Sequence, residues 1–166
     1  MSKQKIIIGI DPGLSGGIAV VALDHTKIHA MPTQPVRVGT AIKRTLDMAQ
    51  IIDIFAEFED TNTEIIIEAQ QSMPNQGVTS SYNNGYHYGL LIGMLLTKYN
   101  NVKIVRAKTW KQYYPRLQGH TRNEQKDIAR EIATELSEDN AHEFVLKKDD
   151  GKAEALLLAQ YYIGIS

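Results

Sequence analysis

The order in which short apolar runs and helical segments alternate restricts the fold of this sequence more than any other feature. Runs rich in β-branched residues predict strands at residues 5–10, 16–23, 27–31, 64–68 and 102–105. Apolar residues at helical spacing predict helices at 40–58, 81–98, 107–114, 123–136 and 151–161. Tight turns join the first three strands into an antiparallel meander, whereas strands separated by helices must run parallel. We therefore predict an α/β fold with a mixed five-stranded sheet flanked by helices, in a single domain covering residues 1–166.

Composition excludes several classes of site and of location. The sequence has no cysteine, which excludes disulfides, thiolate zinc sites and cysteine nucleophiles. Hydrophobic residues make up 43% of the chain, but no apolar run is long enough for a membrane helix. The start, Met1 to Lys5, leads into an Ile-rich strand and does not resemble a signal peptide. We expect a cytosolic protein with no membrane partner.

Charge is distributed unevenly, although the net charge is only −1. Nine basic residues occur between positions 98 and 130: Lys98, Lys103, Arg106, Lys108, Lys111, Arg116, Arg122, Lys126 and Arg130. Only Glu124 and Asp127 oppose them, whereas the residues from Glu131 onward include eight acids and three lysines. A basic segment followed by an acidic one suits an enzyme that holds phosphates and gathers cations, and a solvated helix face is the simpler alternative.

Carboxylates end two of the predicted strands and open the last helix. Asp11 closes the first strand, and Glu68 closes the run Ile65-Ile66-Ile67. Asp150 and Glu154 are spaced i, i+4 and so share one helix face. Taken singly, Asp11 could start a turn with Pro12 and Gly13, and Asp149 or Asp150 could be a helix N-cap.

Together, these acids predict a cation site, provided that the first and fourth strands are neighbours. Two carboxylates about 5 Å apart repel by roughly 3 kcal/mol at an effective dielectric constant near 20. Such a cluster must take up protons or bind a cation, and hard oxygen ligands favour Mg²⁺ or Mn²⁺ over zinc. Two such ions about 4 Å apart could activate a water and stabilise the leaving oxygen of a phosphodiester.

At these residues the sequence resembles the RuvC-type Holliday-junction resolvases, including their phage versions. The matching segments are Ile8-Gly9-Ile10-Asp11-Pro12-Gly13, Ile66-Ile67-Glu68 and residues 150–157. Residues 88–93 resemble the family's helix after the second acid, and residues 105–111 resemble a strand and helix start of the phage members. The order and spacing of these segments fit across nearly the whole chain.

The resemblance implies a ribonuclease-H-like fold, a homodimer, Mg²⁺ dependence and paired nicks across a four-way DNA junction, in the cytosol of a bacterial or phage-infected cell. By the match, Asp11 would bridge two metal ions, Glu68 would bind one or both, and Asp150 with Glu154 would complete the site. The family commonly has Asp where Glu154 stands, and variable spacing leaves Asp149 as an alternative to Asp150. An aromatic residue that often follows the second acid is absent here, which leaves Met73 or Tyr82 to open the junction.

Phosphate contacts are assigned to the basic segment and to the loop after Glu68. The candidate DNA-binding residues are Lys108, Lys111, Arg116, Arg122, Gln70, Gln71 and Ser72. Lys126 is the candidate for a catalytic lysine near the scissile phosphate, because it lies in the helix before the catalytic one. Two aromatic groups, Tyr82 with Tyr86 and Tyr88, and Trp110 with Tyr113 and Tyr114, could stack on bases or pack the core or a dimer face.

Two other functions are compatible with parts of the sequence. Residues 9–17 could form the phosphate-binding hairpin of a sugar-kinase-like or actin-like ATPase, but those folds need two such halves. A ribonuclease or a non-catalytic branched nucleic-acid binder of the same fold would share the scaffold. The complete set of acids favours a nuclease, with no small-molecule cofactor.

Overall fold

The computed structural model describes residues 5–58, 62–71 and 76–166. Its strands are β1 (Lys5–Asp11), β2 (Gly17–Val21), β3 (Thr26–Ala30), β4 (Thr33–Val38), β5 (Ala41–Leu46), β6 (Asn62–Glu68) and β7 (Val102–Val105). Its α-helices are α1 (Met48–Ala56), α2 (Val78–Lys98), α3 (Ala107–Lys111), α4 (Arg122–Leu136) and α5 (Asp150–Ile165). Three short 3₁₀ segments, Pro115–Leu117, Glu138–Phe144 and Lys147–Asp149, connect the last helices.

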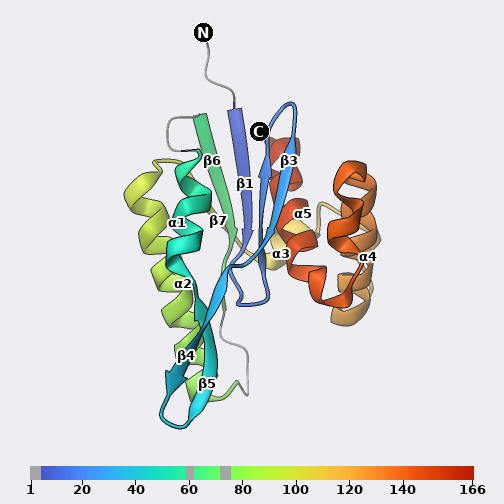
Figure 1. Cartoon of the computed structure of the whole chain (residues 1–166). Helices are drawn as coiled ribbons and strands as arrows, with labels where there is room; N and C mark the ends of the chain where they lie inside the picture. The colour runs from blue at the N-terminus through green and yellow to red at the C-terminus, as the bar shows by residue number, and fades with distance from the viewer. Residues whose placement is uncertain (1–4, 59–61, 72–75) are drawn as a thin grey trace.

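Five strands form the main sheet in the order β3-β2-β1-β6-β7. The meander β1-β2-β3 is antiparallel, and β6 and β7 run parallel to β1 (Figure 1). The predicted mixed five-stranded sheet is therefore confirmed, and so is the placement of the first and fourth predicted strands side by side. This topology is the one that the sequence resemblance to a ribonuclease-H-like fold implies.

Helices cover both faces of the sheet, and the side chains of the central strands alternate between them. Ile6, Ile8 and Ile10 of β1 pack in the core that includes residues of α1 and α2. Ile7 lies in the core on the other face, with residues of α4 and α5. Because side chains of a strand alternate with period two, Asp11 points toward the face that α5 covers.

Two of the helices, α1 and α4, begin at residues whose side chains cap them. Asp47 caps α1 by accepting the Gln50 N–H at 3.1 Å. Thr121 and Glu124 form a capping box at the start of α4. Lys126 lies one turn from the start of α4, and Ala129, Ile132 and Ala133 of this helix pack in the same core as α5.

One predicted helix was wrong in its first half. We expected a helix over residues 40–58, but residues 41–46 form strand β5, which pairs with β4 in a separate two-stranded sheet. Val38 and Ala41 are paired across Gly39 and Thr40, and Gly39 has φ +63°. Glycine adopts this left-handed conformation without strain, as tight hairpin turns require. Only Met48–Ala56 is helical in this region.

Within the part of the chain that the structure describes, no helix combines the length and apolarity needed to cross a lipid bilayer.

Candidate active site

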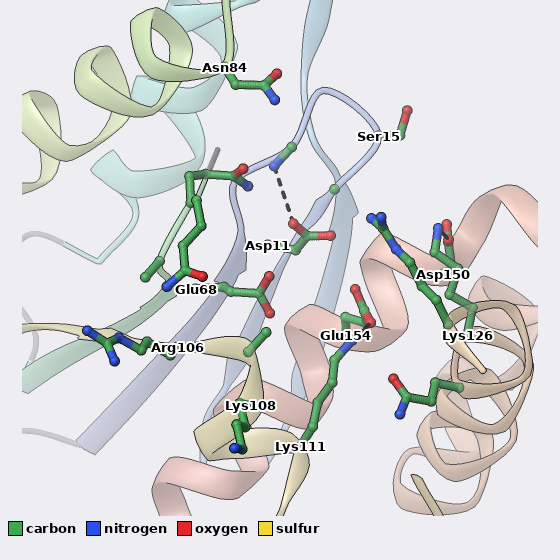
Figure 2. A pocket seen from close by; sticks show the side chains of 18 of the residues that line it. Asp11, Ser15, Glu68, Asn84, Arg106, Lys108, Lys111, Lys126, Asp150 and Glu154 are labelled. Atoms are coloured by element: carbon green, nitrogen blue, oxygen red, sulfur yellow. Dashed lines mark hydrogen bonds and ion pairs between the residues drawn. The ribbon is translucent and has the colours of Figure 1, made fainter. Parts of the chain in front are cut away.

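Two carboxylates meet at one end of the sheet because β1 and β6 are parallel neighbours. The pairing Ile10↔Ile67 puts the next residues, Asp11 and Glu68, at the same edge. Ile66 lies in the core on the α5 side, so the alternation along β6 sends the Glu68 side chain toward α5, as it does for Asp11. Figure 2 shows both side chains facing the start of α5.

Glycines allow α5 to approach this edge through its main chain. Gly16 and Gly151 form an isolated bridge between the turn after β1 and the start of α5. A Cβ on Gly151 would lie 2.3 Å from the carbonyl oxygen of Ser15, and one on Gly9 would lie 2.2 Å from that of Ala155. Backbone packing this close sets the position of Asp150 and Glu154 relative to Asp11.

A cavity of about 850 Å³ opens at this place, and all four acids line it. Its walls also include six of the polar residues assigned to catalysis or DNA binding: Gln70, Gln71, Lys108, Lys111, Arg122 and Lys126. The structure thus brings together, in one open cavity, side chains that the sequence spreads over more than a hundred positions.

Two buried carboxyl groups, those of Asp11 and Glu68, line the cavity where β1 and β6 end. Burial, together with Glu154 and Glu68, raises the pKa of Asp11 from 3.8 to about 8, although the Gly13 N–H donates to its Oδ1 at 3.3 Å. Burial and Glu154 also raise the pKa of Glu68. Both carboxyls therefore resist ionisation unless a positive charge is close by.

Trp110 holds Glu68 in place. Its indole Nε1–H donates to Oε2 of Glu68 at 2.7 Å, which opposes the rise in the Glu68 pKa. The ring itself is fully buried in the core that includes α4 and α5. Of the two expectations for Trp110, packing in the core is the one that its burial supports, and its hydrogen bond to an acid of the site was missed.

Lysines neutralise the two acids of α5. Lys111 Nζ lies 2.5 Å from Oε1 of Glu154, and Lys126 forms an ion pair with Asp150. Lys111 comes from α3 and Lys126 from α4, so a helix on each side supplies one cation (Figure 2). Both lysines were singled out in the sequence, but their ion pairs were not foreseen.

The carboxylate oxygens of these acids are suitable ligands for a hard cation, but the side chains are not arranged around a single metal position. Among residues 5–58, 62–71 and 76–166, no three carboxylate or imidazole groups are placed to hold a metal ion together. Asp150 and Glu154 point to their lysines. Burial first, and the neighbouring carboxyls second, raise the pKa values of Asp11 and Glu68, and a bound divalent cation would favour their ionised forms.

Asp149 is used elsewhere. Its buried side chain accepts the Leu146 N–H at 2.8 Å and pairs with Lys152 at 3.1 Å. It does not belong to the residues that line the cavity. Its geometry fits a cap of the last 3₁₀ turn, and of the two alternatives it leaves Asp150 as the residue that faces the cavity.

Some predicted contact residues lie outside the cavity or outside the described chain. Arg116 binds Glu131 at 3.0 Å and Glu135 at 2.8 Å on the exposed surface of α4, away from the cavity lining. Ser72 and Met73 fall outside the described residues. Tyr82 is 70% exposed and stacks on Tyr86 with ring centroids 6.3 Å apart.

The cavity also contains polar residues that sequence reasoning did not assign to it. They are Ser15, Asn84, Arg106, Gln112, Gln118 and Gln125. Arg106 could have been found, because it directly follows strand β7, whose end lies beside that of β6. The amides carried no such signal, since their spacing in the sequence resembles that of ordinary surface residues.

The fold is ribonuclease-H-like, and two of its carboxylates gather at the edge of the sheet where β1 and β6 end. The chain is similar over nearly its full length to Thermus thermophilus RuvC, with a TM-score of 0.56, 17% identity and 96% of each chain covered. A second structure, T. thermophilus RuvC in complex with a Holliday junction substrate, gives a TM-score of 0.54 at 17% identity and covers 98% of this chain and 96% of that one.

The Fowlpox virus resolvase, in complex with Holliday junction DNA, matches with a TM-score of 0.47 at 15% identity, over 96% of this chain and 97% of that one. The sequence matches no protein-family model, and no curated protein matches it in sequence. The two RuvC structures confirm the fold that the sequence resemblance implies.

Proposed function

We propose that this protein is a Mg²⁺-dependent endonuclease that resolves four-way and other branched DNA by paired nicks, acting as a homodimer. The observation that carries the proposal is the convergence of Asp11, Glu68, Asp150 and Glu154 on one cavity with basic walls. The similarity in fold to RuvC, one structure of which holds a Holliday junction, supports the choice of substrate.

Asp11 and Glu68 would hold the metal ions, with Asp150 and Glu154 completing the set. Mg²⁺, or Mn²⁺ in its place, would supply an activated water and charge stabilisation at the leaving oxygen. Trp110 keeps Glu68 oriented toward the cavity through its 2.7 Å hydrogen bond. Such outer hydrogen bonds typically tune metal affinity by 10–100-fold.

The basic walls would bind the backbone of the substrate. Lys111 and Lys126 pair with the acids of α5 here, and a bound phosphate would offer each an alternative partner. Lys108 and Arg122 line the same cavity without a carboxylate partner among the described ion pairs. Phosphate contacts of this kind position a nucleic acid without reading its sequence.

One experiment separates this proposal from its rivals. Protein is incubated with a labelled four-way junction, a linear duplex and an RNA–DNA hybrid, each with and without Mg²⁺. We expect paired nicks in the junction only, and only with Mg²⁺. Preferred cleavage of the hybrid would instead indicate a ribonuclease, and binding without cleavage of any substrate would indicate a non-catalytic binder.

A further inference from the structure

The β4–β5 hairpin, which we call the arm (residues 33–46), has no assigned role in the site. Its strands pair with each other and with no strand of the main sheet. Figure 1 shows it extending away from the sheet beside the start of α2. Every residue from Gln34 to Arg44 is exposed, so the arm contributes little to the core.

All charged residues of the arm are basic. It carries Arg37, Lys43 and Arg44, and no acidic residue occurs between Met31 and Leu46. In the register of the hairpin, Arg37 pairs with Ile42 and shares a face with Arg44, whereas Lys43 pairs with Val36 on the other face. Cations therefore project from both faces of a narrow ribbon.

The base of the arm is fixed to the edge of the catalytic cavity. The Arg44 guanidinium donates to the carbonyl oxygen of Leu14, in the turn between β1 and β2. Gly13 and Ser15, on either side of Leu14, line the cavity. On the other face, Thr45 lies 3.1 Å from Nε2 of His87 in α2, so the base is held from two sides.

The dimensions of the arm match those of a DNA groove. A strand of six residues spans about 20 Å, which is close to the axial length of six base pairs of B-form DNA at about 3.4 Å each. A two-stranded ribbon fits the major groove, which is about 12 Å wide and has phosphates along both walls. Cations on both faces of the ribbon would meet both walls.

We infer that the arm grips the duplex next to the cleavage point, by entering its groove and contacting phosphates over about six base pairs. The inference rests on the proposed function and extends the DNA-binding surface beyond the cavity. The arm makes these contacts outside the catalytic residues, so it contributes to binding and not to the chemical step.

The test compares two variants that remove the same charge. Arg37→Ala with Lys43→Ala alters the arm and leaves Arg44, which anchors it, in place. Lys98→Ala with Lys103→Ala, the control, removes two cations that do not line the cavity. Junction affinity is measured with Ca²⁺ replacing Mg²⁺, at several KCl concentrations, together with hydroxyl-radical footprints and the melting temperature of each variant.

The arm variant is expected to bind roughly tenfold more weakly and to lower the salt slope by about 2, since each lost phosphate contact lowers it by about 0.9. Its footprint should shorten by about six base pairs, whereas its nicking rate at saturating protein and its melting temperature should stay unchanged. The control variant should resemble the wild type.

Equal loss of affinity in both variants, or a change in sedimentation with an unchanged salt slope, would overturn the role of the arm. The second result would identify the arm as a contact between subunits. If the wild type nicks the junction normally in either case, the proposed nuclease function stands. If the wild type neither binds nor nicks the junction, the proposed function fails as well.

Discussion

Trp110 donates its indole N–H to Glu68 across the space between α3 and the end of β6, at 2.7 Å. This hydrogen bond links a fully buried core residue to a carboxylate of the cavity. Trp110, a residue of the hydrophobic core, thus sets the orientation of the Glu68 carboxylate.

Trp110→Phe should weaken metal binding while an aromatic ring still fills this position in the core. The phenyl ring keeps most of the apolar contacts, but Glu68 loses its donor, and we expect the Mg²⁺ concentration for half-maximal nicking to rise roughly tenfold. A Mg²⁺ titration of nicking measures this effect. Tyr114→Phe is the matched control, because it removes a buried hydrogen bond, to the carbonyl oxygen of Leu157, that does not involve an acid of the site. Equal Mg²⁺ requirements in the two variants would contradict the positioning role of Trp110.

Asp11→Asn should abolish nicking and preserve junction binding, because the amide keeps the shape of the side chain but removes the charge that would hold the metal. Electrophoretic mobility shifts and single-turnover cleavage with Mg²⁺ measure the two properties separately. Full nicking by this variant would remove Asp11 from the catalytic site.

The metal-free protein should lose stability as the pH rises. The pKa of Asp11 is about 8 in the fold against 3.8 in an unfolded chain, so between these values the folded state binds more protons than the unfolded state. The free energy of unfolding therefore falls with increasing pH through this window and levels off above about 8. Urea unfolding in EDTA between pH 5 and 8 measures the slope.

Asp11→Asn should flatten that slope and, at pH 8, raise the free energy of unfolding by roughly 1–3 kcal/mol. Added Mg²⁺ should restore stability to the wild type at pH 8 and have little effect on the variant. Identical pH slopes for both proteins would show that ionisation of Asp11 does not cause the loss of stability at high pH.

Lys111→Ala combined with Lys126→Ala should weaken junction binding and lower its salt slope by about 2, because two phosphate contacts are lost. A suitable control is Lys27→Ala with Arg116→Ala, since both of these cations form ion pairs on the surface outside the cavity. Filter binding over a range of KCl concentrations distinguishes the two double variants. An unchanged slope in the cavity variant would remove these lysines from the DNA-binding surface.

Gly151→Ala should destabilise the fold by roughly 1–3 kcal/mol and greatly reduce nicking, because its Cβ would lie 2.3 Å from the carbonyl oxygen of Ser15 and push α5 from the sheet. Gly85→Ala lies in an exposed helical position with open space around it, and it should stabilise the protein by about 0.5–1 kcal/mol. Thermal unfolding of both variants tests the contrast, and a neutral Gly151→Ala would contradict the close backbone contact.

The strand ends could be predicted from the sequence because their pattern is local. Asp11 and Glu68 each follow a run rich in isoleucine, and the helical segment between those runs implied a parallel pairing. The i, i+4 spacing of Asp150 and Glu154 likewise placed both on one side of α5. These features depend on period and order, which a sequence displays directly.

The arm was missed because both of its faces are exposed. A strand with no buried face lacks alternation between apolar and polar residues, and Ile42 and Leu46, four residues apart, imitated a helix. The Gly39-Thr40 pair was the signal for a hairpin turn at this position. The bond from Trp110 to Glu68 and the lysine pairs could not be predicted, since they join residues about twenty to forty positions apart through side-chain packing.

The bridge between Gly16 and Gly151 joins two main-chain segments of the protein directly, with no side chain between them. Its consequence is that the backbone contact sets the spacing between the acids on the sheet and those on α5. Adjustment to an incoming ion or strand must then come from rotation of the carboxylates and withdrawal of Lys111 and Lys126. The backbone thus fixes the positions of the four acids, and the side chains supply the freedom to rearrange around a ligand.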